Sequence, residues 1–93
     1  MFDSILRRMR EKILAGQYVM GIHAEEEMDE DGLTAFDVEC GILTGEIIER
    51  QKDRATGEWK YLVKGKNLAD EGIVVVGKLS LTRKLFIITV YSE

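Results

Sequence analysis

The sequence predicts an α+β protein in which N-terminal helices pack on one face of a four-stranded antiparallel β-sheet. Apolar residues in the first half recur at helical spacings of three and four, whereas the second half contains four short apolar runs separated by polar turns. The three joints between these runs are too short for parallel crossovers, which need a dozen or more residues. A length of 93 residues fits a single domain spanning residues 1–93.

The first helix is predicted from one apolar stripe, which consists of Phe2, Ile5, Leu6, Met9 and Ile13. Asp3 or Ser4 can cap its start, and Gly16 can end it. The basic side chains lie largely off the stripe and are expected in solvent: Arg7, Arg8, Arg10 and Lys12.

Two shorter helices follow. The second is expected over residues 22–31, closed by Gly32, with a small buried side. The third is expected to begin at Thr34, because Asp37 stands three residues later in the manner of a capping box, and to end at Gly45. Its inward face is predicted to consist of Phe36, Cys40 and Leu43.

The predicted strands are short and rich in β-branched and aromatic residues; they are 46–51, 59–65, 73–79 and 85–91. The last two are apolar on both faces, and a strand of that kind belongs in the middle of a sheet. We therefore expect an antiparallel meander whose last two strands are central.

Charge is divided unequally along the chain, although the net charge is only -4. Residues 22–49 contain ten acidic residues and no Lys or Arg, whereas residues 50–93 contain nine basic and five acidic ones. Such asymmetry suggests a polyanion or an acidic partner for the basic half.

No apolar run of 18 residues and no signal peptide is evident, and the single cysteine cannot form an internal disulfide. These features predict a cytoplasmic protein with no membrane segment.

Several short motifs together resemble a known family. They are His23-Ala24, Met28, Asp37-Val38, Gly45-Glu46-Ile47-Ile48-Glu49, Trp59-Lys60-Tyr61-Leu62 and Ile87-Ile88-Thr89-Val90-Tyr91. This combination resembles the bacterial and archaeal DUF4258 family over roughly residues 18–92. The resemblance implies a relationship to the small RelE-like and ParE-like toxins, whose members include endoribonucleases that act with or without the ribosome. It therefore implies a RelE-like fold and a type II toxin, or a relative that has lost the activity, with a zinc-finger or DNA-binding antitoxin as partner.

The chain departs from that family at one helix. Many members carry arginines after the His-Ala pair, where Glu27 and Asp31 stand here. Acidic residues at these positions argue against contact between this helix and RNA. The isoelectric point near 5.0 also argues against it, because Lys and Arg contacts supply most non-specific nucleic-acid affinity.

Metal-independent RNA cleavage needs a base for the 2′-hydroxyl, an acid for the leaving oxygen and cations for the developing charge. The catalytic candidates are Lys60, Lys78, Tyr91 and His23, and the candidates for binding RNA are Arg50 and Lys64. Each also has a structural interpretation: the lysines can form a solvated face, His23 can pack at a helix start, and Tyr91 can be a core aromatic.

A second hypothesis is a non-enzymatic interaction module, or a degenerate toxin fold, whose acidic helix binds a basic partner. Its candidate binding residues are Glu26, Glu27 and Glu30. A homodimer is compatible with either hypothesis. No cofactor is expected, and no metal site either, because His23 and Glu27 lack further His or Cys ligands that would complete a shell.

Overall fold

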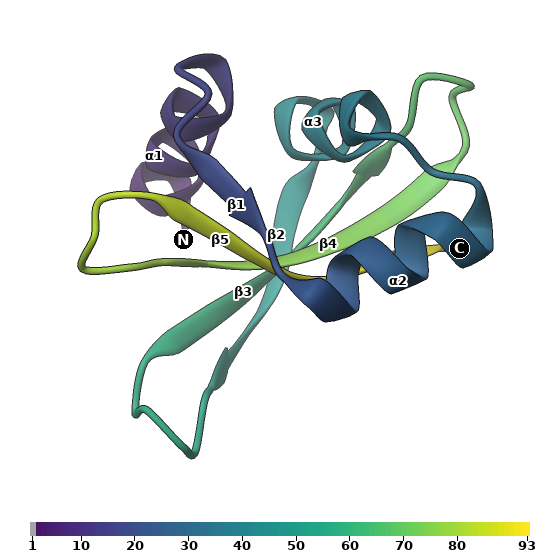
Figure 1. The fold of residues 1–93 in the computed structure, drawn as a ribbon. Helices are drawn as coiled ribbons and strands as arrows, with labels where there is room; N and C mark the ends of the chain where they lie inside the picture. The colour runs from purple at the N-terminus through teal and green to yellow at the C-terminus, as the bar shows by residue number, and fades with distance from the viewer. Residues whose placement is uncertain (1) are drawn as a thin grey trace.

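The computed structural model describes residues 2–93. Its elements follow one another as α1 (Asp3–Leu14), β1 (Tyr18–Met20), α2 (Ile22–Asp31), α3 (Ala35–Thr44), β2 (Glu46–Lys52), β3 (Trp59–Lys66), β4 (Gly72–Leu79) and β5 (Leu85–Ser92). Figure 1 shows α1 and α3 on the same side of the twisted sheet. The protein is therefore of the predicted α+β class.

The sheet has five strands in the order β1-β5-β4-β3-β2. The predicted meander of β2 to β5 is confirmed, since all three of its pairings are antiparallel, and β4 and β5 both lie inside the sheet. The prediction of a four-stranded, wholly antiparallel sheet is wrong, because β1 pairs in parallel with β5, with Tyr18 opposite Leu85. A three-residue strand is too short to show a recognisable alternation, and its partner lies more than sixty residues away.

The predicted end of α2 is confirmed, because Gly32 follows the helix in a left-handed conformation with φ 67°. The start of α3 is held by the predicted capping box, in which the Thr34 side chain accepts a bond from the Asp37 amide. The predicted cap of α1 is wrong. Its N-cap is Phe2, without a side-chain hydrogen bond, and Asp3 instead lies in the first turn, where its charge complements the helix dipole.

The inward face of α3 also differs from the prediction. Val38, Gly41 and Ile42 are buried, whereas Phe36 and Leu43 are 67% and 37% exposed. The helix turns its glycine toward the sheet, where a Cβ atom on Gly41 would lie only 2.8 Å from Cγ2 of Ile73. Close backbone approach thus selects the face, and a pattern based on large apolar residues cannot detect that.

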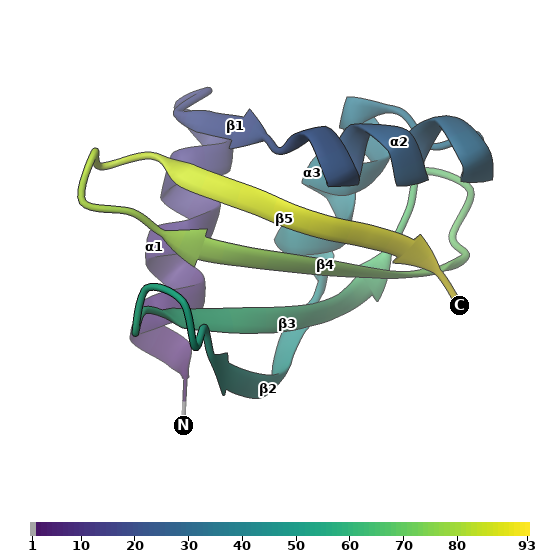
Figure 2. The same ribbon diagram turned by 60° about the horizontal axis from the view of Figure 1, so that its bottom comes forward.

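The core lies between the sheet and the helices. Figure 2 shows the strands in front of α1 and α3, with α2 running beside β5 beyond the end of β1. The apolar side chains that fill the interior come from all these layers and include Met9, Met28, Ile42, Val63, Val75 and Ile87. The other face of the sheet, opposite α1 and α3, carries no helix among residues 2–93, and we call it the open face.

Candidate functional site

Strand alternation places three rows of side chains on the open face. The first row is Gln51, Lys60, Lys78 and Phe86; the second is Glu49, Leu62, Val76 and Thr89; the third is Glu46, Lys64, Val74 and Tyr91. Tyr61 of β3 pairs with Gly77 of β4. Lys60 precedes Tyr61 and Lys78 follows Gly77, so the two lysines are neighbours on adjacent strands. The predicted residues Lys60, Lys78, Lys64 and Tyr91 therefore share one face, with Leu62 and Val76 between its two ends.

Lys78 has a definite set of contacts at one end of this face. Its Nζ lies 3.1 Å from Oε1 of Glu58 and 5.9 Å from the centroid of the Phe86 ring, and its side chain is only 16% exposed. We call Glu58, Lys60, Lys78 and Phe86 the basic corner. An open hollow of about 510 Å³ adjoins it, lined by Thr56, Glu58, Lys78, Ser80, Leu81, Thr82 and Phe86.

Tyr91 and Lys64 lie at the other end of the open face. Tyr91 pairs with Val74, four residues from Lys78 along β4, so it is roughly 13 Å from the basic corner at the usual rise of a strand. Tyr91 is 39% exposed, and Lys64 forms an ion pair of 3.4 Å with Glu93. Lys60, Lys78 and Tyr91 therefore share a face without converging on one point.

The two remaining candidates, His23 and Arg50, lie outside the open face. His23 is exposed on α2, beside the β5 edge, with Nε2 3.7 Å from Oε1 of Glu27. Arg50 pairs with Tyr61, which faces the helices, and its guanidinium stacks 4.0 Å from the centroid of the Trp59 ring. Their predicted catalytic and RNA-binding roles therefore receive no support from proximity to Lys60 and Lys78.

The acidic residues of α2 divide into two groups. Glu27 accepts a hydrogen bond of 3.2 Å from the Val90 amide, and Asp31 accepts one of 3.3 Å from the Ser92 amide. These carboxylates accept hydrogen bonds from β5 amides that lie beyond the end of β1 and so have no partner on a neighbouring strand there. Glu27, which is predicted to bind a partner, therefore also holds α2 against β5. Glu26 and Glu30, the other two residues predicted to bind a partner, are exposed.

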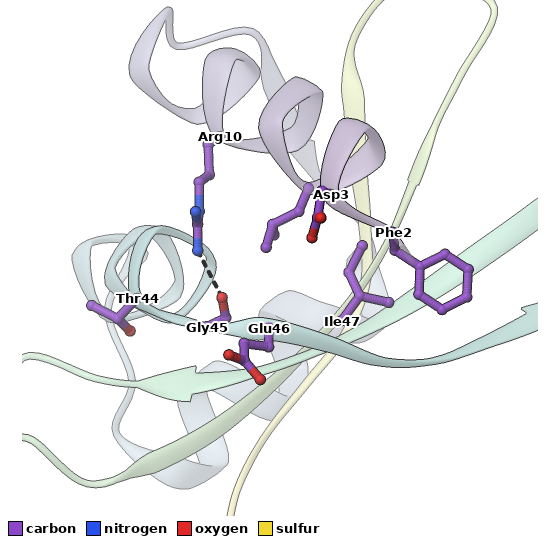
Figure 3. A pocket seen from close by; sticks show the side chains of 8 residues that line it. Phe2, Asp3, Arg10, Thr44, Gly45, Glu46 and Ile47 are labelled. Carbon is purple, nitrogen blue, oxygen red and sulfur yellow. Dashed lines mark hydrogen bonds between the residues drawn. The ribbon is translucent and has the colours of Figure 1, made fainter.

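A second hollow, of about 550 Å³, separates α1 from the end of α3 (Figure 3). Arg10 reaches across it, donating from Nε to the Ile42 carbonyl at 3.1 Å and from Nη2 to the Gly45 carbonyl at 2.7 Å. The prediction that Arg10 is simply solvated is therefore wrong. Its charge stabilises the carbonyl end of α3, where no basic residue lies in the last turn of that helix itself.

Glu58 was not identified from the sequence as the ion-pair partner of Lys78. This residue stands in a polar turn just before β3, two positions from Lys60, and such a placement suggests only an exposed loop. The signal that was available is its alternation with Lys60, which places it on the same side of the chain.

Among residues 2–93, no group of three or more His, Cys, Asp or Glu side chains is arranged to hold a metal ion. None of the helices described is long and apolar enough to cross a membrane.

Comparison with known proteins gives one match. Residues 22–92 match the family model described as "Domain of unknown function (DUF4258)", which covers most of the chain. No curated protein and no solved structure matches the sequence.

Proposed function

The chain belongs to the DUF4258 family, and from that premise we propose that it is a toxin-like, metal-independent endoribonuclease related to the RelE-like and ParE-like toxins. The observation that carries the proposal is the pair Lys60 and Lys78, adjacent on a sheet face that no described helix covers. Two positive charges on rigid strands can hold a phosphate and stabilise the charge that develops on it.

The basic corner offers groups for both proton transfers. In the proposed step, the RNA 2′-oxygen attacks the adjacent phosphorus, and the bond from phosphorus to the 5′-oxygen breaks. Glu58 accepts the 2′-hydroxyl proton, Lys60 gives a proton to the leaving oxygen, and Lys78 remains beside the charged phosphate. The products are a 2′,3′-cyclic phosphate and a free 5′-hydroxyl, so no water or metal enters the balance. Phe86 supplies a ring on which a base can stack.

Tyr91 and Lys64 fit a different role in this proposal. Because they lie roughly 13 Å from the basic corner, they would contact the same RNA strand farther along, with Lys64 near a phosphate and Tyr91 against a base. Leu62, partly exposed between these ends, would lie beneath the strand. An antitoxin of the zinc-finger or DNA-binding type is the partner that this proposal requires.

The test uses purified protein and a fluorescently labelled RNA oligonucleotide, with and without ribosomes. Lys60→Ala is the leading variant because this side chain has no hydrogen bond or ion pair among residues 2–93. Its cleavage rate should fall on the order of a hundredfold. Lys52→Ala removes an equal charge from the helix side of the sheet, near Trp59, and should leave cleavage unchanged.

Glu58→Gln should abolish cleavage while RNA binding persists, because it removes the base and keeps the shape of the side chain. The proposal is wrong if the wild-type protein is harmless on expression and leaves RNA intact both with and without ribosomes. Cleavage that yields no cyclic phosphate would exclude the mechanism above.

A second candidate function is the non-enzymatic interaction module or degenerate toxin fold. Two observations favour it: Lys64 and Lys78 are each paired with a carboxylate, and the isoelectric point is about 5.0. Both reduce the attraction of the open face for a polyanion. This candidate predicts a folded protein that binds a protein partner and neither binds nor cleaves RNA in the assays above.

A further inference from the structure

The outer side of α3 carries an apolar stripe that the fold does not use. Phe36, Cys40 and Leu43, spaced by four and three residues, lie on one side of the helix, and we call them the α3 stripe. Phe36 is 67% exposed, Leu43 is 37% exposed and Cys40 is partly exposed. The buried residues Val38, Gly41 and Ile42 lie on the opposite side, so α3 is apolar on both faces.

This pattern is unusual for a helix that packs on only one side. A surface helix normally presents polar residues to water, whereas apolar residues at successive turns are the anchors by which helices recognise a partner. Leu68, 66% exposed, follows β3 next to this helix, because its amide donates a 3.0 Å hydrogen bond to Oδ1 of Asp37. The exposed apolar surface thus extends beyond α3 itself.

The surrounding charge selects the chemistry of the occupant. The charged residues of α3 are Asp37 and Glu39, which flank the α3 stripe on its two sides. Arg10 of α1 contacts only the carbonyl end of the helix. A second copy of the chain docked through the same stripe would bring these carboxylates of the two copies together. Like charges at an interface oppose association, whereas a basic segment would be attracted to this surface.

We infer that the α3 stripe is the docking surface for a basic amphipathic helix of another protein. Apolar side chains of that helix contact Phe36, Cys40 and Leu43, and its lysines or arginines lie toward Asp37 and Glu39. The exposed residues Glu26 and Glu30 contribute attraction at a distance rather than the contact itself. This inference is independent of RNA cleavage, because α3 and the open face lie on opposite sides of the sheet (Figure 2).

The probe is a synthetic peptide of about four helical turns, with leucines at spacings of three and four and lysines elsewhere. A matched peptide carries glutamates in place of the lysines. Cys40 is the only cysteine of the chain, so its alkylation by a maleimide reports directly on the stripe. The basic peptide should bind the wild-type protein and slow alkylation of Cys40, and the acidic peptide should do neither.

The stripe is tested by the double variant Phe36→Ser with Leu43→Ser, which should weaken binding of the basic peptide at least about tenfold. The control is Leu81→Ser, which removes an apolar side chain that is 99% exposed after β4 and should leave binding unchanged. If the double variant does not fold, protection of Cys40 in the wild-type protein still decides the question.

Two results would overturn the inference. Undiminished binding to the double variant, or unprotected Cys40 in the bound state, would show attraction by charge alone. The wild-type protein could instead sediment as a dimer, and the double variant Phe36→Ser with Leu43→Ser as a monomer. That result would show that a second copy of the chain, not another protein, docks on the stripe.

Discussion

At the scale of single residues, the hydrogen bond between Tyr18 and Glu39 ties β1 to α3. The Tyr18 hydroxyl donates to Oε2 of Glu39 at 2.5 Å. Burial of the hydroxyl, and then the hydrogen bond and charge of Glu39, raise the pKa of Tyr18 from 10.0 to about 12. Because the folded state raises this pKa, the contribution of Tyr18 to stability is complete below the pKa of the unfolded chain and is lost progressively as pH rises through the folded value.

This bond predicts a specific dependence of stability on pH. Above pH 10, Tyr18 of the unfolded chain ionises while the folded state still holds the proton, so the contribution of Tyr18 is lost as pH rises toward 12. Tyr18→Phe should cost about 1–2 kcal/mol in urea unfolding at neutral pH. Its difference from the wild-type protein should shrink between pH 10 and pH 12.

The matched control is Tyr91→Phe, which makes the same chemical change at a hydroxyl on an exposed side chain. It should alter the free energy of unfolding little at any of these pH values. A constant difference between Tyr18→Phe and the wild-type protein across the alkaline range would contradict the assignment.

At the scale of elements, α2 is stabilised by its tertiary contacts more than by its own sequence. The pairs Glu25–Asp29, Glu26–Glu30 and Glu27–Asp31 place like charges four residues apart, and no basic residue occupies the last turn. Both arrangements destabilise an isolated helix. Burial of Ala24 and Met28, and the bonds from Glu27 and Asp31 to β5, compensate for them.

Glu30→Lys should therefore stabilise the protein. The substitution replaces a repulsive pair with an attractive one, and it places a cation near the negative end of the helix dipole. We expect an increase of roughly 0.5–1.5 kcal/mol in the free energy of unfolding at low salt. The gain should diminish in concentrated salt, because exposed charges are screened.

Glu30→Gln, which removes only the repulsion, should give a smaller increase by the same denaturation measurement. A gain for Glu30→Lys that does not change with salt would indicate a cause other than charge. If α2 also attracts a basic partner, the stabilised variant should associate with it more slowly.

The same elements show what the sequence could predict and why the rest needed the structure. Glycine stops, the capping box of α3 and the four apolar runs are local signals, and the corresponding boundaries are correct to within about one residue. The pairing of β1 with β5 and the bonds from α2 to β5 join distant segments, so no local pattern could indicate them.

The inward side of α3 shows a different limit. Both sides of this helix are apolar, and close approach at Gly41 determines which side is buried. For the candidate site, Lys60 and Lys64 lie four residues apart on one strand, and that spacing alone places them on the same face. It could not reveal that Glu58 pairs with Lys78, or that Tyr91 lies at the opposite end of the face.

At the scale of the whole molecule, two candidate surfaces lie on opposite sides of one sheet. The open face carries the basic corner, whereas the α3 stripe lies on the side of α3 that faces away from the sheet, between Asp37 and Glu39. The molecule measures 32 × 25 × 24 Å, and at about 0.1 M salt exposed charges are screened over about 10 Å. The two surfaces are therefore far enough apart to act separately.

This separation predicts that substitutions on one surface leave the other unaffected. Lys60→Ala should weaken RNA binding while changing the affinity for the basic peptide less than about twofold, because distant sites contribute additively. Phe36→Ser with Leu43→Ser should have the reverse effect. Fluorescence anisotropy of each labelled ligand, measured separately with each purified variant, avoids the direct attraction between a basic peptide and RNA. Proportional loss of both affinities in either variant would show that the two surfaces form one site, or that they are coupled through the packing of α3 on β3 and β4.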